Sequence, residues 1–349
     1  MVTDMHPMPQ TTDRKTFFVT GASGFIGTAL VRRLRANGHN VRCAVRSATG
    51  DASEIECRLD SSPETWVAAL SGVDGVFHLA WSTSPRSANA SPLADLTTNL
   101  VGTVGLLEAM RVSASGPIVL ASSGGTVYGA PTRLPVSENH ALNPLGVYGA
   151  SKVSAETYAM VYRRQFGIDA RILRFSNPYG PGQNVDGQLG AASIFAYRAL
   201  SNLPINIWGD GFVVRDYVYI EDTIDAMLAT MSAARETFRD IDPIINIGSG
   251  QGVSLRKIIQ VIEEILARPV EVNYQPARAF DVPVSVLDVS LAKHLLNWHP
   301  KTSFEFGMQR TLRHLMLTSS SMPPVPSVQH TLSHMTSLFQ NDIAKERSS

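Results

Sequence analysis

The residues T-F-F-V-T-G-A-S-G-F-I-G, from Thr16 to Gly27, are the strongest indication of how this chain folds. Its first five residues are β-branched or aromatic, which is typical of a buried strand. Residues 28–35 then place apolar side chains on one side and arginines on the other, as in an amphipathic helix. Such a strand–turn–helix unit presents backbone N–H groups at a helix N-terminus, where a pyrophosphate can bind. We therefore predict a dinucleotide site in which Gly21 permits the tight turn and Gly24 the approach to the phosphates.

Short apolar runs alternate with helical patterns through the first half of the chain. The runs are residues 40–45, 75–79, 117–122 and 170–175. This alternation predicts an α/β fold built on a doubly wound parallel sheet of the Rossmann type. After Asn177 the alternation breaks. Short strands at 205–209 and 270–274 and a helix at 254–266 predict a second, smaller C-terminal lobe, with the ligand between the lobes.

A tyrosine and a lysine four positions apart, Tyr148 and Lys152, follow in a helical pattern. Residues with this spacing share one face of a helix. An ammonium group beside a phenol favours the phenolate and lowers its pKa from about 10 toward neutrality. A general base works best when its pKa lies near the operating pH. An ordinary surface pair would have the same spacing, but the upstream glycine turn favours Tyr148 as an acid/base that Lys152 tunes.

Composition excludes several other classes of protein. Of the 349 residues 17% are charged, and the formal net charge is zero, so bulk charge indicates no nucleic acid and no anionic membrane as a partner. Residues 1–14 lack the apolar core of a signal peptide, and no run is long enough to span a membrane. Two cysteines, Cys43 and Cys57, fit a reduced, cytoplasmic protein. The nine histidines form no metal-ligand pattern.

These motifs together resemble a known family. The matching stretches are residues 21–27, 78–80, 99–103, 122–129, 148–152, 174–182, 215–218, 246–248 and 278–281. Between about Lys15 and Leu315 the chain resembles the extended short-chain dehydrogenase/reductase superfamily. Within it, the chain is similar to the UDP-hexose 4-epimerases of the NAD-dependent epimerase/dehydratase family.

The resemblance implies a division into domains. The dinucleotide-binding domain is expected at 15–177, with residues 217–248 returning to it. The nucleotide-sugar lobe is then expected at 178–216 and 249–317. We expect residues 1–14 to be disordered and residues 318–349 to form a loosely ordered tail, because both segments have little apolar periodicity.

The resemblance also implies a set of cofactor contacts. They are Gly21, Ser23, Gly24, Phe25, Ile26, Gly27, Arg46, Asp60, Leu79, Ala80, Asn99, Tyr148 and Lys152. Val45 stands where the epimerases have an aspartate for the ribose, and Arg46 follows it. An arginine there can accommodate a 2′-phosphate, or it is a solvated loop residue. We expect NAD, because a cofactor that never leaves needs less discrimination, and NADP remains compatible with Arg46.

A UDP-linked sugar is the implied substrate. Its implied contacts are Asn177, Trp208, Arg215, Arg278, Asp281 and Ser285. Two arginines give charge-assisted, bidentate contacts to a diphosphate, and Asn177 is expected beside them. Trp208 is expected to pack against uracil. In the family a residue four places after Asp281 gates the sugar 2-substituent, and the small Ser285 leaves room there for an N-acetyl group.

The segment from Ser122 to Gly129 bears on the reaction. It lacks the Asp-Glu pair of the related dehydratases and the glutamate of the related decarboxylases, so the resemblance implies 4-epimerisation of a UDP-hexose. Gly124 replaces the usual catalytic Ser or Thr, and Ser123 or Thr126 must then supply the hydroxyl. Three alternatives remain: an NADP-dependent nucleotide 4-keto-sugar reductase, a non-catalytic dinucleotide-sensing protein, and a different epimerase that acts at another carbon or on another nucleotide. The family often forms homodimers through two helices per subunit, expected here at 93–110 and 148–165.

The mechanism that the resemblance implies begins at the sugar 4-hydroxyl. Tyr148 removes its proton as a phenolate, while the hydrogen at C4 leaves as hydride to the nicotinamide. Lys152 binds the ribose and holds down the tyrosine pKa. Arg215 and Arg278 anchor the UDP while the 4-keto sugar rotates, and the hydride then returns to the opposite face.

Overall fold

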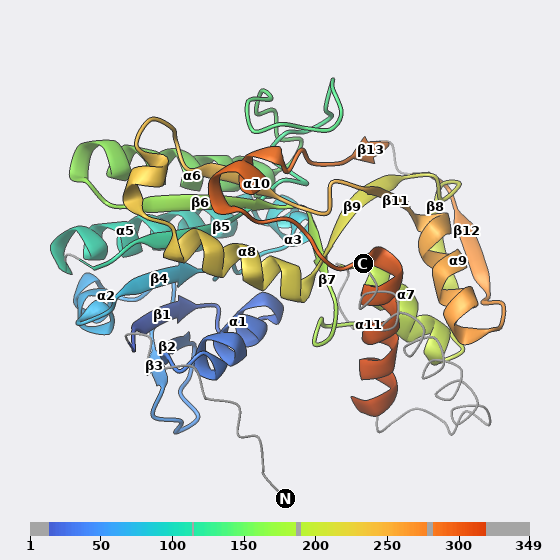
Figure 1. Cartoon of the computed structure of the whole chain (residues 1–349), viewed down its shortest axis with the longest axis horizontal. Helices are drawn as coiled ribbons and strands as arrows, with labels where there is room; N and C mark the ends of the chain where they lie inside the picture. The colour runs from blue at the N-terminus through green and yellow to red at the C-terminus, as the bar shows by residue number, and fades with distance from the viewer. Residues whose placement is uncertain (1–13, 114, 186–189, 278–281, 319–349) are drawn as a thin grey trace, which may run out of the picture.

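The computed structural model describes residues 14–113, 115–185, 190–277 and 282–318. The larger part is a parallel sheet of seven strands in the order β10-β6-β5-β4-β1-β2-β3 (Figure 1). Its strands are β1 (Thr16–Thr20), β2 (Asn40–Val45), β3 (Glu54–Glu56), β4 (Gly75–His78), β5 (Ile118–Ser123), β6 (Ala170–Phe175) and β10 (Ile244–Ile247). The predicted doubly wound sheet is confirmed, because the strand order reverses beside β1 and helices cover both faces.

Two apolar layers hold these helices on the sheet. One face carries α1 (Phe25–Ala36) and α8 (Ile220–Ser232), which bury Leu30, Leu34 and Met227. The helices of the other face are α2 (Pro63–Leu70), α5 (Val101–Ser113) and α6 (Val147–Phe166). They bury Trp66 and Leu106. Both layers form because each helix has one apolar stripe that is stable only against another element.

The connection between β4 and α5 is built from short helices. They are α3 (Pro85–Ala90), α4 (Pro92–Asp95) and the π-helical turn η1 (Leu96–Leu100), which continues into α5. Ser84 caps α3 by accepting a hydrogen bond from the N–H of Ser87. This connection passes over the carboxyl edge of the sheet and brings Asp95 and Asn99 into the interior, where both are fully buried.

The predicted second lobe is also present, at the right of Figure 1. Its mixed sheet has β9 (Val214–Tyr219) between β11 (Gly252–Ser254) and β13 (Val284–Ser285), and β7 (Asn177–Tyr179) also pairs with β9. A second ribbon pairs β8 (Ile205–Trp208) with β12 (Val272–Gln275). The lobe's helices are α7 (Ala191–Leu200), α9 (Leu255–Leu266) and α11 (Phe304–Thr318). The remaining elements are η2 (Arg235–Phe238) and α10 (Ser290–Leu296).

The chain crosses between the lobes several times. Residues 217–219 belong to β9 in the smaller sheet, and the chain then enters α8, whose Glu221 and Asp225 pair with Arg33 of α1. Strand β10 extends the large sheet beside β6. The domain boundaries drawn from the sequence remain a prediction. Residues 1–13 and 319–349, most of the two predicted terminal segments, lie outside the described residues.

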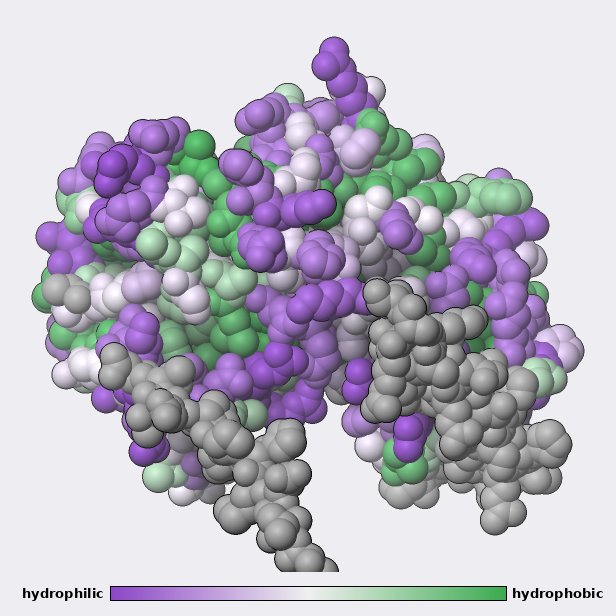
Figure 2. Space-filling model, viewed as in Figure 1, coloured by the Kyte–Doolittle hydropathy of each residue, from purple (hydrophilic) through white to green (hydrophobic). Residues whose placement is uncertain are grey.

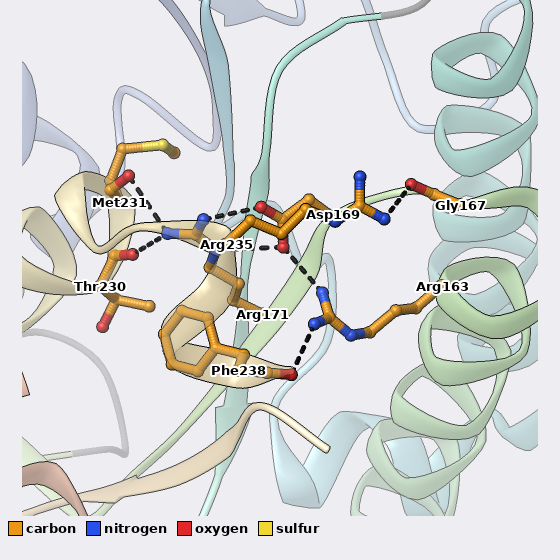
Figure 3. A network of polar contacts seen from close by, with 8 residues as sticks. All are labelled: Arg163, Gly167, Asp169, Arg171, Thr230, Met231, Arg235 and Phe238. Carbon is orange, nitrogen blue, oxygen red and sulfur yellow. Dashed lines mark hydrogen bonds and ion pairs between the residues drawn. The ribbon is translucent and has the colours of Figure 1, made fainter. Parts of the chain in front are cut away.

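A polar network closes the amino edge of the large sheet (Figure 3). The carboxylate of Asp169 forms ion pairs with two arginines. Its Oδ1 lies 2.7 Å from Arg163 Nη1, and its Oδ2 lies 2.6 Å from Arg171 Nη2. Arg171 also donates to the carbonyl of Thr230 near the end of α8, where a cation stabilises unpaired helix carbonyls. Arg163 lies 15 positions after Tyr148 on α6, about 22 Å along the helix. The network therefore stabilises the end of the fold that is remote from Tyr148.

Candidate active site

The glycine turn lies between β1 and α1 and needs glycine at two positions. Gly21 has φ +69°, and a Cβ there would lie 2.8 Å from the backbone nitrogen of Ala80. A Cβ on Gly27 would overlap the carbonyl oxygen of Gly21. Gly24 is the N-cap of α1, and no side chain caps that helix end. The turn thus packs closely on the end of β4 and leaves helix N–H groups for an anion, so these residues fit a dinucleotide pyrophosphate.

A buried relay of hydroxyl and imidazole groups fixes the ends of β1 and β4. Thr103 Oγ1 donates to a carbonyl of η1 at 2.7 Å, so it accepts from His78 Nε2 at 3.0 Å. His78 Nδ1 then accepts from Thr20 Oγ1 at 2.8 Å. That same oxygen accepts from the N–H groups of Leu79 and Ala80, both at 3.2 Å. Burial, with the nearby charge of Lys152, lowers the pKa of His78 to about 3, so the ring is neutral and the relay is fully satisfied.

Asn99 holds the loop after β4. Its Nδ2 donates to Thr83 Oγ1 at 3.0 Å and to Asp95 Oδ1 at 2.9 Å. Its Oδ1 accepts from both N and Oγ of Ser82, at 2.7 and 3.0 Å. The amide is therefore fully occupied by protein groups, and a direct cofactor contact from Asn99 stays a prediction. The other oxygen of Asp95 accepts from Ser151 Oγ, which ties this loop to α6.

Tyr148 and Lys152 lie in the first two turns of α6, beside the carboxyl end of β5. Lys152 Nζ donates to the carbonyl of Ala121 at 2.8 Å and lies 5.7 Å from the centroid of the Tyr148 ring. Only 4% of Lys152 is exposed, and this burial lowers its pKa to about 7 against the opposing charges of Glu156 and Asp95. Burial, together with Asp95, raises the pKa of Tyr148 to about 12.

The predicted direction of the tyrosine shift is therefore wrong for the protein alone. We expected Lys152 to lower the pKa of Tyr148 toward neutrality. Instead the phenolate would form in a poorly solvated place, and the charge that acts on it is the carboxylate of Asp95. The spacing of the two residues predicted their proximity but gave no indication of Asp95, which lies more than fifty positions upstream.

The segment from Ser122 to Gly129 shows why residue 124 is a glycine. A Cβ on Gly124 would lie 2.6 Å from Leu287 Cδ1 and 3.2 Å from the carbonyl oxygen of Arg174. Leu287 is buried and fills the space that a Ser or Thr side chain would need. Thr126 Oγ1 is buried and finds no hydrogen-bond partner among the described residues. Ser123 ends β5 and is half-buried.

A buried ion pair between Arg174 and Glu156 contacts two residues of this segment, Ser122 and Tyr128. Arg174 Nη2 lies 2.7 Å from Glu156 Oε2, and Ser122 Oγ also donates to Glu156. Arg174 Nη1 donates to the hydroxyl of Tyr128 at 2.9 Å, which donates to Asn246 Oδ1 at 2.7 Å. Breaking a buried pair by removing one partner typically costs about 3–5 kcal/mol. The network therefore fixes the segment rigidly between β5, β6 and α6.

The predicted substrate residues are partly brought together. Arg215 and Ser285 lie directly opposite each other on β9 and β13. Asn177 begins β7 and donates from Nδ2 to the carbonyl of Asp216 at 2.8 Å, so it lies one strand away from Arg215. Trp208 ends β8 and is 43% exposed, in the outer part of the lobe. Arg278 and Asp281 lie outside the described residues.

The predicted adenosine-side residues are on the surface beyond β2 and β3. Arg46 follows Val45 at the end of β2 and is exposed, which is compatible with either interpretation of it. Asp60 accepts from Arg58 Nε at 2.9 Å, and this pairing lowers the pKa of its carboxyl group. Asp60 is therefore ionised and already partnered, and its contact with a cofactor stays a prediction.

Two further residues of the site were missed by the sequence interpretation. Leu287 contacts position 124 from more than 160 residues away, and no local pattern indicates that contact. Trp81 directly follows the predicted Ala80 and places its ring against Lys152. An aromatic residue three positions after a buried strand, next to the residues that pack on the glycine turn, was the available signal for Trp81.

This chain is similar to known enzymes that act on sugar nucleotides. The UDP-glucose 4-epimerase of Mycolicibacterium smegmatis is 35% identical over 306 residues, covering 84% of this chain and 96% of that protein. The dTDP-4-dehydro-6-deoxyglucose reductase of Escherichia coli is 29% identical over 317 residues, covering 84% and 96%. The crystal structure of Thermotoga maritima UDP-glucose 4-epimerase with UDP-glucose has a TM-score of 0.80 and 32% identity, covering 87% of this chain and 99% of that one.

The model of the NAD dependent epimerase/dehydratase family matches residues 17–248, and the chain belongs to this family. It is an NAD-dependent, 4-epimerase-like enzyme that modifies nucleotide sugars, and the resemblance stated from its motifs is confirmed. Within the described ranges, no helix is long and apolar enough to cross a membrane, and no cluster of His, Cys, Asp or Glu is suited to a metal ion.

Proposed function

We propose that the protein is a nucleotide-sugar 4-epimerase that inverts C4 of a UDP-hexose. The observation that carries this proposal is the placement of Tyr148 and Lys152 at the carboxyl edge of the parallel sheet. The glycine turn lies at the same edge, because Gly21 packs against the backbone of Leu79 and Ala80, which follow the carboxyl end of β4. A phenol and a buried ammonium beside a dinucleotide site are the groups that alcohol–ketone interconversion on a sugar requires.

The roles of the residues follow from their positions. Tyr148 exchanges a proton with the sugar 4-oxygen through its phenol oxygen. Lys152 offers its ammonium to the ribose and to the reacting centre. Thr126 is the better of the two candidate hydroxyls, because its oxygen is buried and has no hydrogen-bond partner among the described residues, whereas Ser123 is only half-buried. Arg215 holds the diphosphate from β9 while the sugar turns.

When bound, a nicotinamide dinucleotide would supply the hydride-transfer chemistry of this reaction. The residues that would hold it are the glycines of the turn for the pyrophosphate, with Leu79 and Ala80 beside them. NAD is the expected form, as in the crystal structure of Thermus thermophilus UDP-glucose 4-epimerase complexed with NAD, which is 31% identical with a TM-score of 0.77. Arg46 leaves NADP compatible with the site.

A 4-keto-sugar reductase is the second candidate. Leu287 excludes a hydroxyl at position 124, and the raised pKa of Tyr148 keeps its phenol protonated in the protein alone. A protonated phenol suits proton donation to a keto oxygen, the step that a reductase needs. The similarity to a dTDP-sugar reductase supports the same candidate.

The deciding experiment combines the bound nucleotide with turnover. The purified protein is denatured, the released nucleotide is identified, and UDP-glucose is tested for conversion to UDP-galactose without added reductant. Tightly held NAD with conversion supports the epimerase, and Tyr148→Phe should then lower turnover by about a hundredfold or more. Consumption of NADPH with a nucleotide 4-keto sugar, and no conversion of UDP-glucose, would replace the first proposal by the second.

We also propose a homodimer through the α5–α6 face. Apolar side chains are exposed on these two helices and on the short helices that lead into α5: Leu93 on α4, Leu96 on η1, Val101 and Val112 on α5, and Tyr158 on α6. An exposed apolar face of this kind is typical of a protein–protein contact. By contrast, the face of the molecule drawn in Figure 2 has polar areas interspersed among apolar ones. The molar mass in solution tests the proposal, and Val101→Glu should reduce it to that of one chain.

A further inference from the structure

The ring of Trp81 contacts both Lys152 and Tyr148. Its ring centroid is 3.6 Å from Lys152 Nζ, so the ammonium rests on the indole face. The same ring meets the ring of Tyr148 edge-on, with centroids 6.0 Å apart and planes at 71°. Lys152 has one hydrogen bond among the described residues, to the carbonyl of Ala121. The indole is therefore a second contact that positions the ammonium.

The backbone on both sides of Trp81 is fixed. Before it, the N–H of Ala80 donates to Thr20 Oγ1 at 3.2 Å. After it, the N–H of Ser82 donates to Asn99 Oδ1 at 2.7 Å. The indole is thus held on a rigid loop, as positioning residues of a site need to be.

The indole N–H is the unexplained part of this arrangement. Trp81 Nε1 is buried and finds no hydrogen-bond partner among the described residues. A buried tryptophan N–H usually has a partner, and an unpaired one requires a reason. By contrast, the buried Trp298 donates from Nε1 to the carbonyl of Asp222 at 3.1 Å.

We propose that Trp81 is a positioning and ligand-binding residue, whose ring face holds the Lys152 ammonium and whose Nε1–H donates to an oxygen acceptor of the bound ligand. This inference rests on the proposed function. The acceptor is a hydroxyl, carbonyl or phosphate oxygen, and such oxygens occur on both the dinucleotide and the sugar nucleotide. Binding of each ligand separately distinguishes the two sources.

The charged and titratable groups facing Lys152 set the expected size of the effect. Asp95 and Glu156 favour the ammonium, whereas burial opposes it, and His78 is neutral. The phenol of Tyr148 is uncharged at neutral pH. Besides these two carboxylates, the indole ring of Trp81 also stabilises the positive charge of Lys152. Removing a desolvated cation–π contact should lower the pKa of Lys152 by about one unit.

The test compares Trp81→Leu, Trp81→Phe and the control Trp298→Phe. Each protein is first freed of any nucleotide that it retains on purification. Affinities for NADH alone and for UDP-glucose alone are then measured by calorimetry from about pH 6 to about pH 10, which spans the titration of Lys152. In Trp81→Leu the pH above which NADH affinity falls should move down by about one unit. Trp81→Phe keeps a ring face, so its pH profile should match the unmodified protein. It should lose about fivefold in affinity for the ligand that accepts from Nε1.

Several results would overturn the inference. Trp81→Leu could show the unmodified pH profile, or bind NADH more tightly because the indole merely obstructs the site. Trp81→Phe could bind both ligands as the unmodified protein does, and this arm remains decisive if Trp81→Leu does not fold. Equal changes in Trp298→Phe would show a general loss of stability. If the unmodified protein, freed of the nucleotide it retains on purification, binds no NADH, the proposed function fails, a result distinct from the failure of Trp81.

Discussion

Placing a serine at position 124 tests why this chain has a glycine where the family resemblance implies a Ser or Thr. In Gly124→Ser the new Cβ would lie 2.6 and 3.1 Å from the two methyl carbons of Leu287 and 3.2 Å from a backbone oxygen of Arg174. Carbon atoms prefer about 3.5–4.0 Å, so the overlap with the leucine is close to 1 Å. Overpacking of a buried position typically costs about 1–3 kcal/mol, and we expect Gly124→Ser to fall in that range.

The second half of the test removes the obstacle. Leu287→Ala empties a buried leucine position, which typically costs about 2–5 kcal/mol. In the double variant the serine enters part of the space that the leucine left, so the two changes should not add. We expect the double variant to be more stable than the sum of the singles by at least about 1 kcal/mol, within the range for residues in contact. If the rebuilt hydroxyl meets the sugar, the double variant should also gain turnover relative to Leu287→Ala.

The assay is urea unfolding of all four proteins of the cycle, read as the free energy of unfolding. Gly125→Ser is the matched control, because a Cβ there meets no atom within 4 Å. Its stability should stay within about 0.5 kcal/mol of the unmodified protein. The steric reasoning fails if Gly124→Ser is as stable as Gly125→Ser, or if the two single effects add in the double variant.

Three further predictions concern the reaction and its substrate. Thr126→Val should lower turnover by about a hundredfold, the typical effect of losing one such donor, while Ser123→Ala should have little effect; the reverse order would reassign the hydroxyl. The pKa of Lys152 is lowered to about 7 from 10.5, so between these values the unfolded chain holds a proton that the folded protein lacks. Lys152→Met should therefore raise the free energy of unfolding most at pH 7 and below, with a gain that shrinks toward pH 10.5, and a pH-independent difference would contradict the burial argument. Ser285→Tyr should selectively abolish turnover of UDP-N-acetylglucosamine relative to UDP-glucose, and an equal loss of both would refute an open gate at this position.

The large sheet was predictable because its strands carry their own signal. Strands β1, β2 and β6 have the predicted limits, since buried parallel strands are continuous apolar runs. The glycine turn was readable for a similar local reason: Gly21 and Gly27 each face backbone atoms at a distance that no side chain tolerates. The strands of the smaller sheet were not predicted in full. The pairing of β13 with β9 joins Val284 to Val214 across seventy positions, and two residues give no periodicity.

The site was predictable where chemistry and local spacing coincide. Tyr148 and Lys152 share one helical face, and the structure brings them together as their spacing requires. Their electrostatics were not predictable, because burial and the distant Asp95 determine them. Gly124 was recognised as a departure, but its cause lies in Leu287, which the chain places beside it only through folding.

Asp95 connects the architecture of the site with the direction of its chemistry. Its two oxygens accept from Thr83 and Asn99 on one side and from Ser151 of α6 on the other, so it joins the loop after β4 to the helix that carries Tyr148 and Lys152. The same carboxylate raises the pKa of Tyr148 and opposes the phenolate. A neutral group with the same hydrogen bonds would hold the loop without that opposition. In the protein alone Tyr148 is therefore protonated at neutral pH, the form that the proposed 4-keto-sugar reduction uses, whereas the proposed 4-epimerisation uses the phenolate, which a positive charge beside the phenol favours.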